Sequence, residues 1–224
     1  MNEALAKSSR AVVEGIFEIQ PVIISCPERD ELLKRTLAAF TATDWASHSP
    51  MVHIDTSNFA RAQRRQEYNS RAALKAALKT GTEFILFMED DLIFNKSLYH
   101  NLCCWLPPRQ EDLFLGSLYN PGIREWRRCK KDNYFVAEPD AVYGSQCFLM
   151  NRQVAKYLVE HWSEVEGMQD IKISRLIARF APIYYHTPSL VQHVGTQSVW
   201  GGRHHTAADF SEDFAAAPLS EVRV

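Results

Sequence analysis

Short apolar runs alternate with amphipathic stretches along the first half of the chain. The runs at residues 21–26 (PVIISC) and 84–88 (FILFM) consist of β-branched and bulky apolar residues, the pattern of buried strands. A shorter strand is expected at 51–54. Residues 29–40 and 60–80 carry their apolar side chains at helical spacing. The order strand–helix–strand–helix–strand predicts an α/β domain with right-handed crossovers and a mostly parallel central sheet.

The second half of the chain has a mixed pattern. Short apolar runs predict further strands, and periodic stretches predict further helices. The expected strands are 113–118, 147–150, 183–185 and 189–193, and the expected helices are 152–162 and 168–180. Neither an internal repeat nor a linker-like tract interrupts the sequence. We therefore expect one domain over residues 19–205, preceded by an appendage at 1–18 and followed by a tail at 206–224.

Composition narrows the class of protein. A chain of 224 residues with 46% hydrophobic and 23% charged residues can bury a substantial core. Its formal net charge is only -2, so no basic field covers the whole domain, and nucleic acid is not an expected partner.

The apolar runs and the cysteines indicate in which compartment the protein resides and whether it crosses a membrane. The longest apolar runs are shorter than a membrane span, so no transmembrane segment is expected. The first twenty residues lack the apolar region and cleavage site of a signal peptide. The five cysteines form no CxxC pair, and an odd number fits a reducing compartment. We predict a cytoplasmic protein.

The acidic triplet Glu89-Asp90-Asp91 directly follows the apolar run FILFM. In open α/β sheets, ligands bind beyond the carboxyl ends of the strands. Three adjacent carboxylates repel one another, and a cation would compensate them. Oxygen ligands favour Mg²⁺ or Mn²⁺, which share their coordination with water and substrate phosphates. The alternative is a strand that ends in a solvated acidic turn.

These motifs resemble a known family. A first strand followed by CPER (26–29), then Asp55, then FILFMEDDL resembles the GT-A nucleotide-sugar glycosyltransferases. The segment LVQHVGTQS at 190–198 is similar to the QHVGTHSS-type stretch of the N-acetylglucosaminyltransferase IV group, with Gln197 where that group usually has a second histidine. The resemblance covers residues 21–198 and implies a Rossmann-like GT-A domain.

The resemblance implies a donor site built around the triplet. Asp91 would contact a metal that bridges the donor's diphosphate, Asp90 would face the ribose or a metal-bound water, and Glu89 would face the donor sugar. The guanidinium of Arg29 would pair with phosphate. Asp55 would accept a hydrogen bond from uracil or ribose. Read alone, Arg29 is equally a solvated residue at a helix start, and Asp55 an ordinary turn residue.

Three further residues complete the expected site. The resemblance makes His193 a metal or diphosphate contact and Gly144 a donor-sugar contact. Asp170, at the start of a predicted helix, is the expected general base, since an inverting transfer must deprotonate the acceptor hydroxyl. Helix capping alone is the other interpretation of Asp170. Glu164 and Glu166 are the fallback bases.

Two charged segments each allow more than one interpretation. Arg203, His204 and His205 could close over a diphosphate as a lid, but we favour a solvated tail. The basic run at 124–131 (REWRRCKK) could hold an anionic acceptor or contact an anionic membrane surface peripherally, but it is more simply a solvated loop.

The leading hypothesis is a metal-dependent, inverting glycosyltransferase that uses Mn²⁺ or Mg²⁺. It would move a sugar, with GlcNAc tried first, from a UDP-sugar donor to a hydroxyl of a glycan or glycolipid acceptor. The alternatives are a nucleotidyltransferase, a metal-dependent phosphoesterase, and a GT-A-like module that binds nucleotide or glycan without turnover. A nucleotidyltransferase would normally carry a Gly-rich basic loop after its first strand, which CPERD at 26–30 is not.

Overall fold

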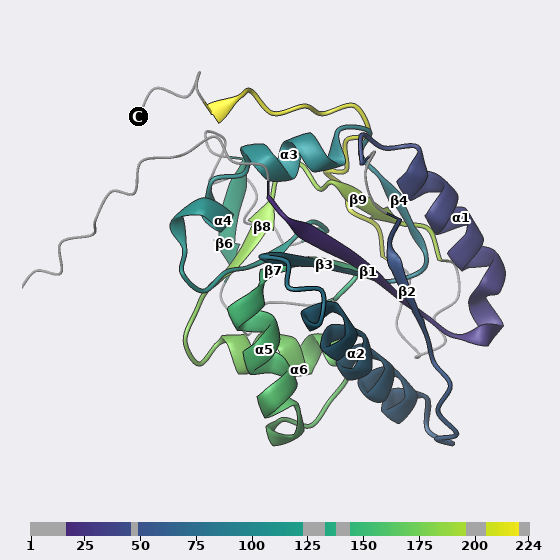
Figure 1. Cartoon of the computed structure of the whole chain (residues 1–224). Coiled ribbons are helices and arrows are strands. Elements are labelled where there is room, and N and C mark those ends of the chain that lie inside the picture. Colours follow the sequence, from purple (N-terminus) through teal and green to yellow (C-terminus); the bar gives the residue numbers. More distant parts are fainter. Residues whose placement is uncertain (1–16, 46–48, 123–132, 138–143, 196–204, 220–224) are drawn as a thin grey trace, which may run out of the picture.

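The computed structural model describes residues 17–45, 49–122, 133–137, 144–195 and 205–219. Their main feature is a seven-stranded sheet (Figure 1). In spatial order its strands are β2 (Met51–Ile54), β1 (Ile19–Ser25), β3 (Phe84–Met88), β7 (Cys147–Asn151), β5 (Leu115–Ser117), β8 (Ile183–His186) and β6 (Tyr134–Ala137). Strands β1, β2, β3, β5 and β8 share one direction, whereas β7 and β6 run opposite. The predicted α/β domain with a mostly parallel sheet is confirmed.

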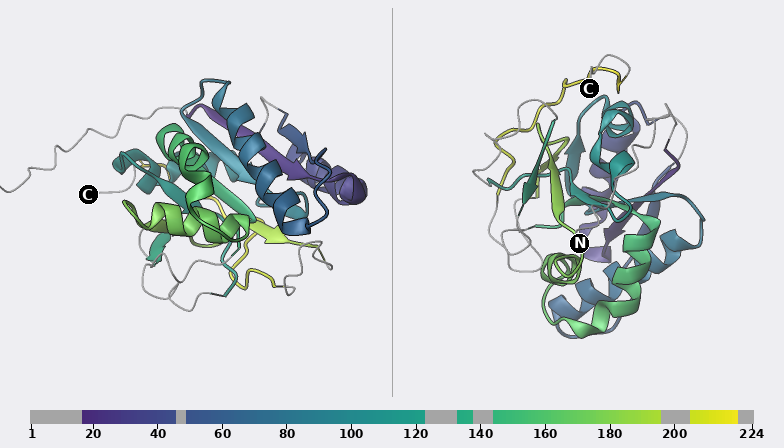
Figure 2. Two further views of the ribbon diagram at one scale, coloured as in Figure 1. Left: turned by 90° about the horizontal axis from the view of Figure 1, so that it is seen from below. Right: turned by 90° about the vertical axis from the view of Figure 1, so that its left-hand side faces the viewer.

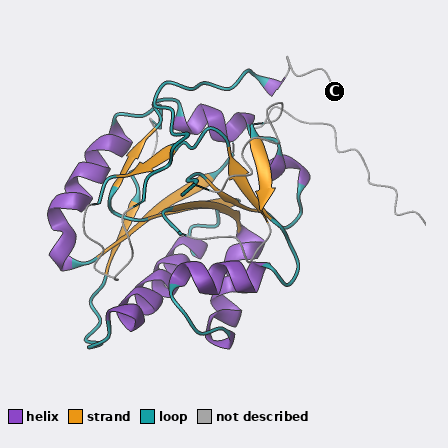
Figure 3. Cartoon of the chain, turned by 180° about the vertical axis from the view of Figure 1, so that it is seen from behind, coloured by secondary structure: helices purple, strands orange, loops and turns teal. Residues whose placement is uncertain are grey.

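Helices cover both faces of this sheet. Figures 1 and 3 show α2 (Ala62–Leu78), α5 (Arg152–His161) and α6 (Gln169–Ile177) on one side. On the other side lie α1 (Asp30–Thr41), α3 (Leu98–Cys104) and the short α4 (Pro107–Gln110), and Figure 2 shows the same layers from two further directions. Two 3₁₀ segments, Pro27–Arg29 and Trp162–Glu164, lead into α1 and follow α5. The domain is thus a three-layer sandwich.

The position of β3 at the centre of the sheet explains why its sequence is apolar throughout. Its five residues are all buried. Ile85 and Phe87 belong to the core beneath α2, α5 and α6, while Phe84, Leu86 and Met88 belong to the core on the opposite face. An uninterrupted apolar run is therefore required wherever both faces of a strand are covered.

A small two-stranded ribbon lies outside the sheet. Strand β4 (Leu92–Phe94) pairs antiparallel with β9 (Val191–His193), and Leu92 is opposite His193. The sequence pattern predicts β9 within 189–193 but gives no strand at β4, no helix at α3 or α4, and no strand at β6. These elements have three to seven residues each, too short for a periodic signal.

Residues 205–219 contain no long regular element, yet they are held against α3 and β4. The side-chain amide of Asn95 donates to the carbonyls of Ser211 (2.7 Å) and Phe214 (2.9 Å). Asn101 donates to the same Phe214 carbonyl at 2.9 Å. Figure 1 shows this segment, in yellow, passing beside α3. At the other end Phe17, within the expected appendage, packs on Phe84 with ring centroids 4.7 Å apart.

Two further findings concern the cysteines and membrane-crossing helices. The four cysteines in the described part of the chain are free thiols, and Cys129 lies outside it. Over that same part, no helix combines the length and the apolar character that a membrane crossing requires.

Candidate functional site

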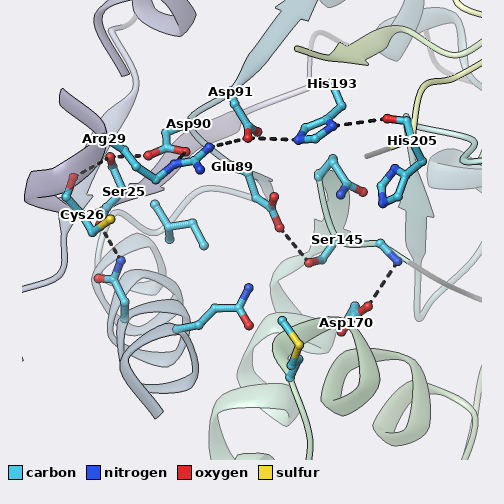
Figure 4. A pocket seen from close by; sticks show the side chains of 16 residues that line it. Ser25, Cys26, Arg29, Glu89, Asp90, Asp91, Ser145, Asp170, His193 and His205 are labelled. Atoms are coloured by element: carbon cyan, nitrogen blue, oxygen red, sulfur yellow. Dashed lines mark hydrogen bonds and ion pairs between the residues drawn. The ribbon is translucent and has the colours of Figure 1, made fainter. Parts of the chain in front are cut away.

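A cavity of about 210 Å³ opens where β1 and β3 end, on the edge at which the sequence places its acidic triplet (Figure 4). Parallel strands bring their carboxyl ends to the same edge of a sheet, and side chains that follow them in sequence converge there. Seven residues predicted from sequence line this cavity: Arg29, Glu89, Asp90, Asp91, Gly144, Asp170 and His193. The eighth, Asp55, does not.

Arg29 is buried against the last two carboxylates of the triplet. Its Nε donates to Oδ1 of Asp90 at 2.7 Å, and its Nη2 donates to Oδ2 of Asp91. Burial acts to lower the pKa of Arg29, but the two carboxylates outweigh it and the pKa is raised. Burial raises the pKa of Asp90, which Arg29 and the hydroxyl of Ser25 oppose. A fixed positive charge thus lies inside the acidic cluster.

His193 meets Asp91 from the neighbouring ribbon. The Val194 amide donates to the Asp91 carbonyl at 2.9 Å, so the backbone of the segment after β9 is tied to the triplet. Burial would lower the pKa of His193, but the carboxylate of Asp91 raises it overall. Burial likewise pushes the pKa of Asp91 upward, and His193 together with Arg29 brings it below its ordinary value. Asp91 therefore favours the protonated form of the imidazole, and His193 favours the ionised form of the carboxylate.

The donor set around Asp91 fits a divalent cation shared with a phosphate ligand. Oδ1 of Asp91 is buried and, within the described residues, accepts no hydrogen bond. Gly195 lies against this carboxylate so closely that a Cβ would overlap it. In the described part of the chain, no group of three His, Cys, Asp or Glu side chains is placed to hold a metal alone. Mg²⁺ and Mn²⁺ are commonly held by one or two protein side chains plus substrate phosphates and water.

Glu89 faces the other half of the cavity, as Figure 4 shows. Its Oε1 accepts hydrogen bonds from the Ser145 hydroxyl at 3.1 Å and from the Gln169 amide at 2.6 Å. Burial, with a smaller contribution from the charge of Asp91, raises the pKa of Glu89 to about 7. The triplet is thus divided between two environments: Asp90 and Asp91 adjoin Arg29, whereas Glu89 adjoins neutral donors.

Asp170 enters the cavity from the first turn of α6, so the prediction that it begins a helix is confirmed. Its Oδ1 accepts from the Ile171 amide at 2.8 Å, and its Oδ2 accepts from the Gly144 amide at 3.3 Å. Gly144 has a φ of 79°, a left-handed conformation that favours glycine. The fallback bases Glu164 and Glu166 are exposed and do not line the cavity.

Asp55 follows β2 as predicted but is engaged elsewhere. Its Oδ2 accepts from Nε of Arg65 at 2.6 Å, and its Oδ1 accepts from the Ser57 amide at 3.0 Å. The same Arg65 forms a two-pronged ion pair with Glu28. The role of Asp55 in nucleoside binding stays a prediction.

Among the cavity residues that sequence does not assign to the site are Ser145 and His205. Gln169 is a further residue that sequence does not assign: it does not line the cavity, but it contacts Glu89 and Ser145 from behind. The favoured expectation of a solvated tail does not hold for His205: its Nδ1 lies 2.7 Å from the Tyr119 hydroxyl, and its ring centroid lies 5.5 Å from that of His193. A second histidine near the QHVGT segment was the available signal. Arg203, His204 and the basic run at 124–131 lie outside the described residues.

Comparisons with known proteins add little beyond this geometry. No family model and no curated protein matches the sequence. One similar solved structure is a mutant β-1,4-galactosyltransferase 7 from Drosophila in complex with manganese, UDP-Gal and xylobiose, 14% identical, with a TM-score of 0.49 over 84% of this chain and 81% of that one. Another is A197 from STIV, 11% identical, with a TM-score of 0.47 over 80% of this chain and 86% of that one. Likenesses of this size do not establish a family.

The fold and the cavity together define the class of protein: an α/β domain with a buried acidic site at the carboxyl edge of its sheet.

Proposed function

We propose that the protein is a metal-dependent, inverting glycosyltransferase of the GT-A type. It would transfer a sugar from a UDP-sugar, with GlcNAc the first to test, to a hydroxyl of a glycan or glycolipid. The observation that carries this proposal is the convergence of seven residues, singled out by sequence alone, on one cavity at the expected edge of the sheet. The histidine of the QHVGT segment is among them, which supports an N-acetylglucosaminyltransferase IV-like relative.

The donor's diphosphate would bind beside Arg29. Its guanidinium is already oriented by Asp90 and Asp91, so little side-chain entropy remains to be lost on binding. Asp91 and His193 would hold Mn²⁺ or Mg²⁺ together with phosphate oxygens. The metal would stabilise the negative charge that develops on the departing nucleoside diphosphate. In this arrangement Asp90 would face the ribose.

The acceptor hydroxyl would approach from the side of α6. Asp170 is the carboxylate on that side, and the amides of Gly144 and Ile171 fix its orientation. A carboxylate held in this way can accept the proton of the hydroxyl as it attacks the donor sugar. The donor sugar would then lie between Glu89 and the loop at Gly144, with the leaving diphosphate on its far side. That geometry inverts the anomeric centre.

The first experiment is calorimetric titration of UDP and UDP-GlcNAc with and without Mn²⁺. We expect binding that requires the metal and weakens by at least about tenfold in Asp91→Asn, because a charged ligand to the metal is lost. Asp213→Asn is the matched control, since that carboxylate is exposed and pairs with Lys96 at 2.7 Å, outside the cavity. Absence of nucleotide binding with any divalent metal would overturn the proposal.

Analysis of the reaction products distinguishes the glycosyltransferase from a phosphoesterase and from a binding module without turnover. Incubation with UDP-GlcNAc and a set of glycan and glycolipid hydroxyl acceptors should release UDP and form a product whose anomeric configuration, measured by NMR, is opposite to that of the donor. Release of UMP or inorganic phosphate would indicate a phosphoesterase. Metal-dependent binding without any product would indicate a binding module.

A further inference from the structure

A closed set of hydrogen bonds surrounds the side chain of Gln169. This residue begins α6 and is 1% exposed. Its Nε2 lies 2.6 Å from Oε1 of Glu89 and 2.6 Å from Oγ of Ser145, and Ser145 itself donates to Oε1 of Glu89 at 3.1 Å. On the other side, the hydroxyl of Ser70 contacts Oε1 of Gln169. The amide thus uses both its donor and its acceptor ends.

These partners come from four separate segments. Glu89 follows β3, Ser145 precedes β7, Ser70 belongs to α2, and Gln169 belongs to α6. Ser70 and Ser145 are also buried, and both contribute to satisfying the Gln169 amide, while the Ser70 hydroxyl also lies 2.7 Å from the Gln66 carbonyl. A buried amide in such a network has one low-energy orientation.

The network fixes how Glu89 is presented to the cavity. Two donors hold its Oε1, so the carboxyl group cannot rotate without losing both hydrogen bonds. Among the described residues these hydrogen bonds engage Oε1, so Oε2 is the oxygen placed to meet a ligand. Gln169 also directly precedes Asp170 in the first turn of α6. It therefore connects Glu89, on the donor-sugar side, to the helix turn that carries the proposed base Asp170.

We infer that Gln169 is a positioning residue for the sugar half of the donor: it holds Glu89 in the orientation that accepts a sugar hydroxyl and sets its spacing from Asp170. This inference rests on the proposed function. A purely structural role, in which Gln169 only joins α2 to α6, predicts a different result. Loosening of that packing would affect UDP and UDP-sugar binding alike, whereas the positioning role concerns the sugar alone.

The test compares the affinity for UDP-GlcNAc with that for UDP, in Mn²⁺, for wild type and Gln169→Met. Methionine keeps the length of the side chain and removes the amide. We expect the Kd for UDP-GlcNAc to rise about tenfold while the Kd for UDP stays within about twofold, the effect of disturbing one hydrogen bond to a charged group. Gln153→Met, on the exposed face of α5, is the matched control and should leave both values unchanged.

A second variant tests the inference independently, in case Gln169→Met does not fold. Ser145→Ala removes the other donor to Oε1 of Glu89 and should shift the same ratio in the same direction. Equal weakening of UDP and UDP-GlcNAc, or no change in either, would overturn the inference while leaving the donor site intact. Failure of the proposed function itself would be visible earlier, as wild-type protein that binds neither ligand.

Discussion

Nε2 of His193 lies 3.0 Å from Oδ2 of Asp91, although 102 positions separate the two residues in the chain. The pairing of β4 with β9 produces this contact, because Asp91 immediately precedes β4 and His193 ends β9. The position of the histidine is therefore set by backbone hydrogen bonds as well as by its own side chain.

Replacing His193 by alanine should weaken Mn²⁺-dependent UDP binding by about tenfold or more, because a nitrogen ligand to the metal is lost. Calorimetric titration measures the change. His161→Ala is the matched control: its ring is half-buried at the end of α5 and contacts Glu164, outside the cavity. Equal affinity in both variants would remove His193 from the metal site.

Asp170→Asn should lower kcat by about 100-fold or more with little change in the Kd of the donor. Asparagine keeps the size of the side chain, and its single oxygen can still accept the hydrogen bond from the Ile171 amide, although the contact with the Gly144 amide is lost. The helix turn should therefore persist while the proton acceptor is lost. Steady-state kinetics together with donor titration separates the two quantities. Glu164→Gln serves as control, and retention of most of kcat in Asp170→Asn would assign the base elsewhere.

Gly144→Ala and Gly81→Ala form a matched pair. Both glycines have positive φ, 79° and 84°, so alanine at either should cost about 1–2 kcal/mol of unfolding free energy. At Gly81 a Cβ meets nothing within 4 Å, whereas at Gly144 it would overlap the side chain of Gln146. We expect Gly144→Ala to cost more in urea unfolding and to impair donor binding as well. Equal costs and intact binding would contradict a close approach at Gly144.

Acid should destabilise the fold through His186. This ring is 1% exposed and donates from Nδ1 to the Pro188 carbonyl at 2.7 Å. Burial lowers the pKa of His186 from an ordinary 6.5 to about 4. Because the unfolded chain takes up the proton first, the stabilisation is complete above pH 6.5 and is lost as the pH falls toward 4, at most roughly 3 kcal/mol.

Urea unfolding at pH 7, 5.5 and 4.5 checks this expectation against His186→Asn. Asparagine can keep a donor near the Pro188 carbonyl but takes up no proton. The variant should be less stable at pH 7, since it leaves part of the ring's space unfilled, yet lose less stability on acidification. Parallel curves for the two proteins would show that His186 does not govern the acid response.

Much of the fold and the site follows from local sequence. The run FILFM marks the central strand because burial on both faces demands apolar side chains at every position. The triplet then falls at the carboxyl edge of the sheet, where Arg29, after β1, must also lie. These placements need only strand positions and a parallel sheet.

The remaining features depend on contacts that no local pattern encodes. Strand β4 has three residues, and its existence depends on β9. Asp55 follows a strand as expected, but its carboxylate forms an ion pair with Arg65 from the first turn of α2. Gln169 and Ser145 carry no motif, and their relation to Glu89 spans 80 and 56 positions. Such relations arise only when the sheet has assembled.

The anchored segment 205–219 contributes His205 to the cavity, so its attachment can be thermodynamically linked to ligand binding. Backbone and amide contacts hold this segment without any helix or sheet of its own, and His205 reaches the cavity from its first position. Detaching the segment would withdraw His205 from the cavity. Any ligand that contacts His205 thereby strengthens the attachment of the segment, and a tighter attachment strengthens the binding of the ligand by the same factor.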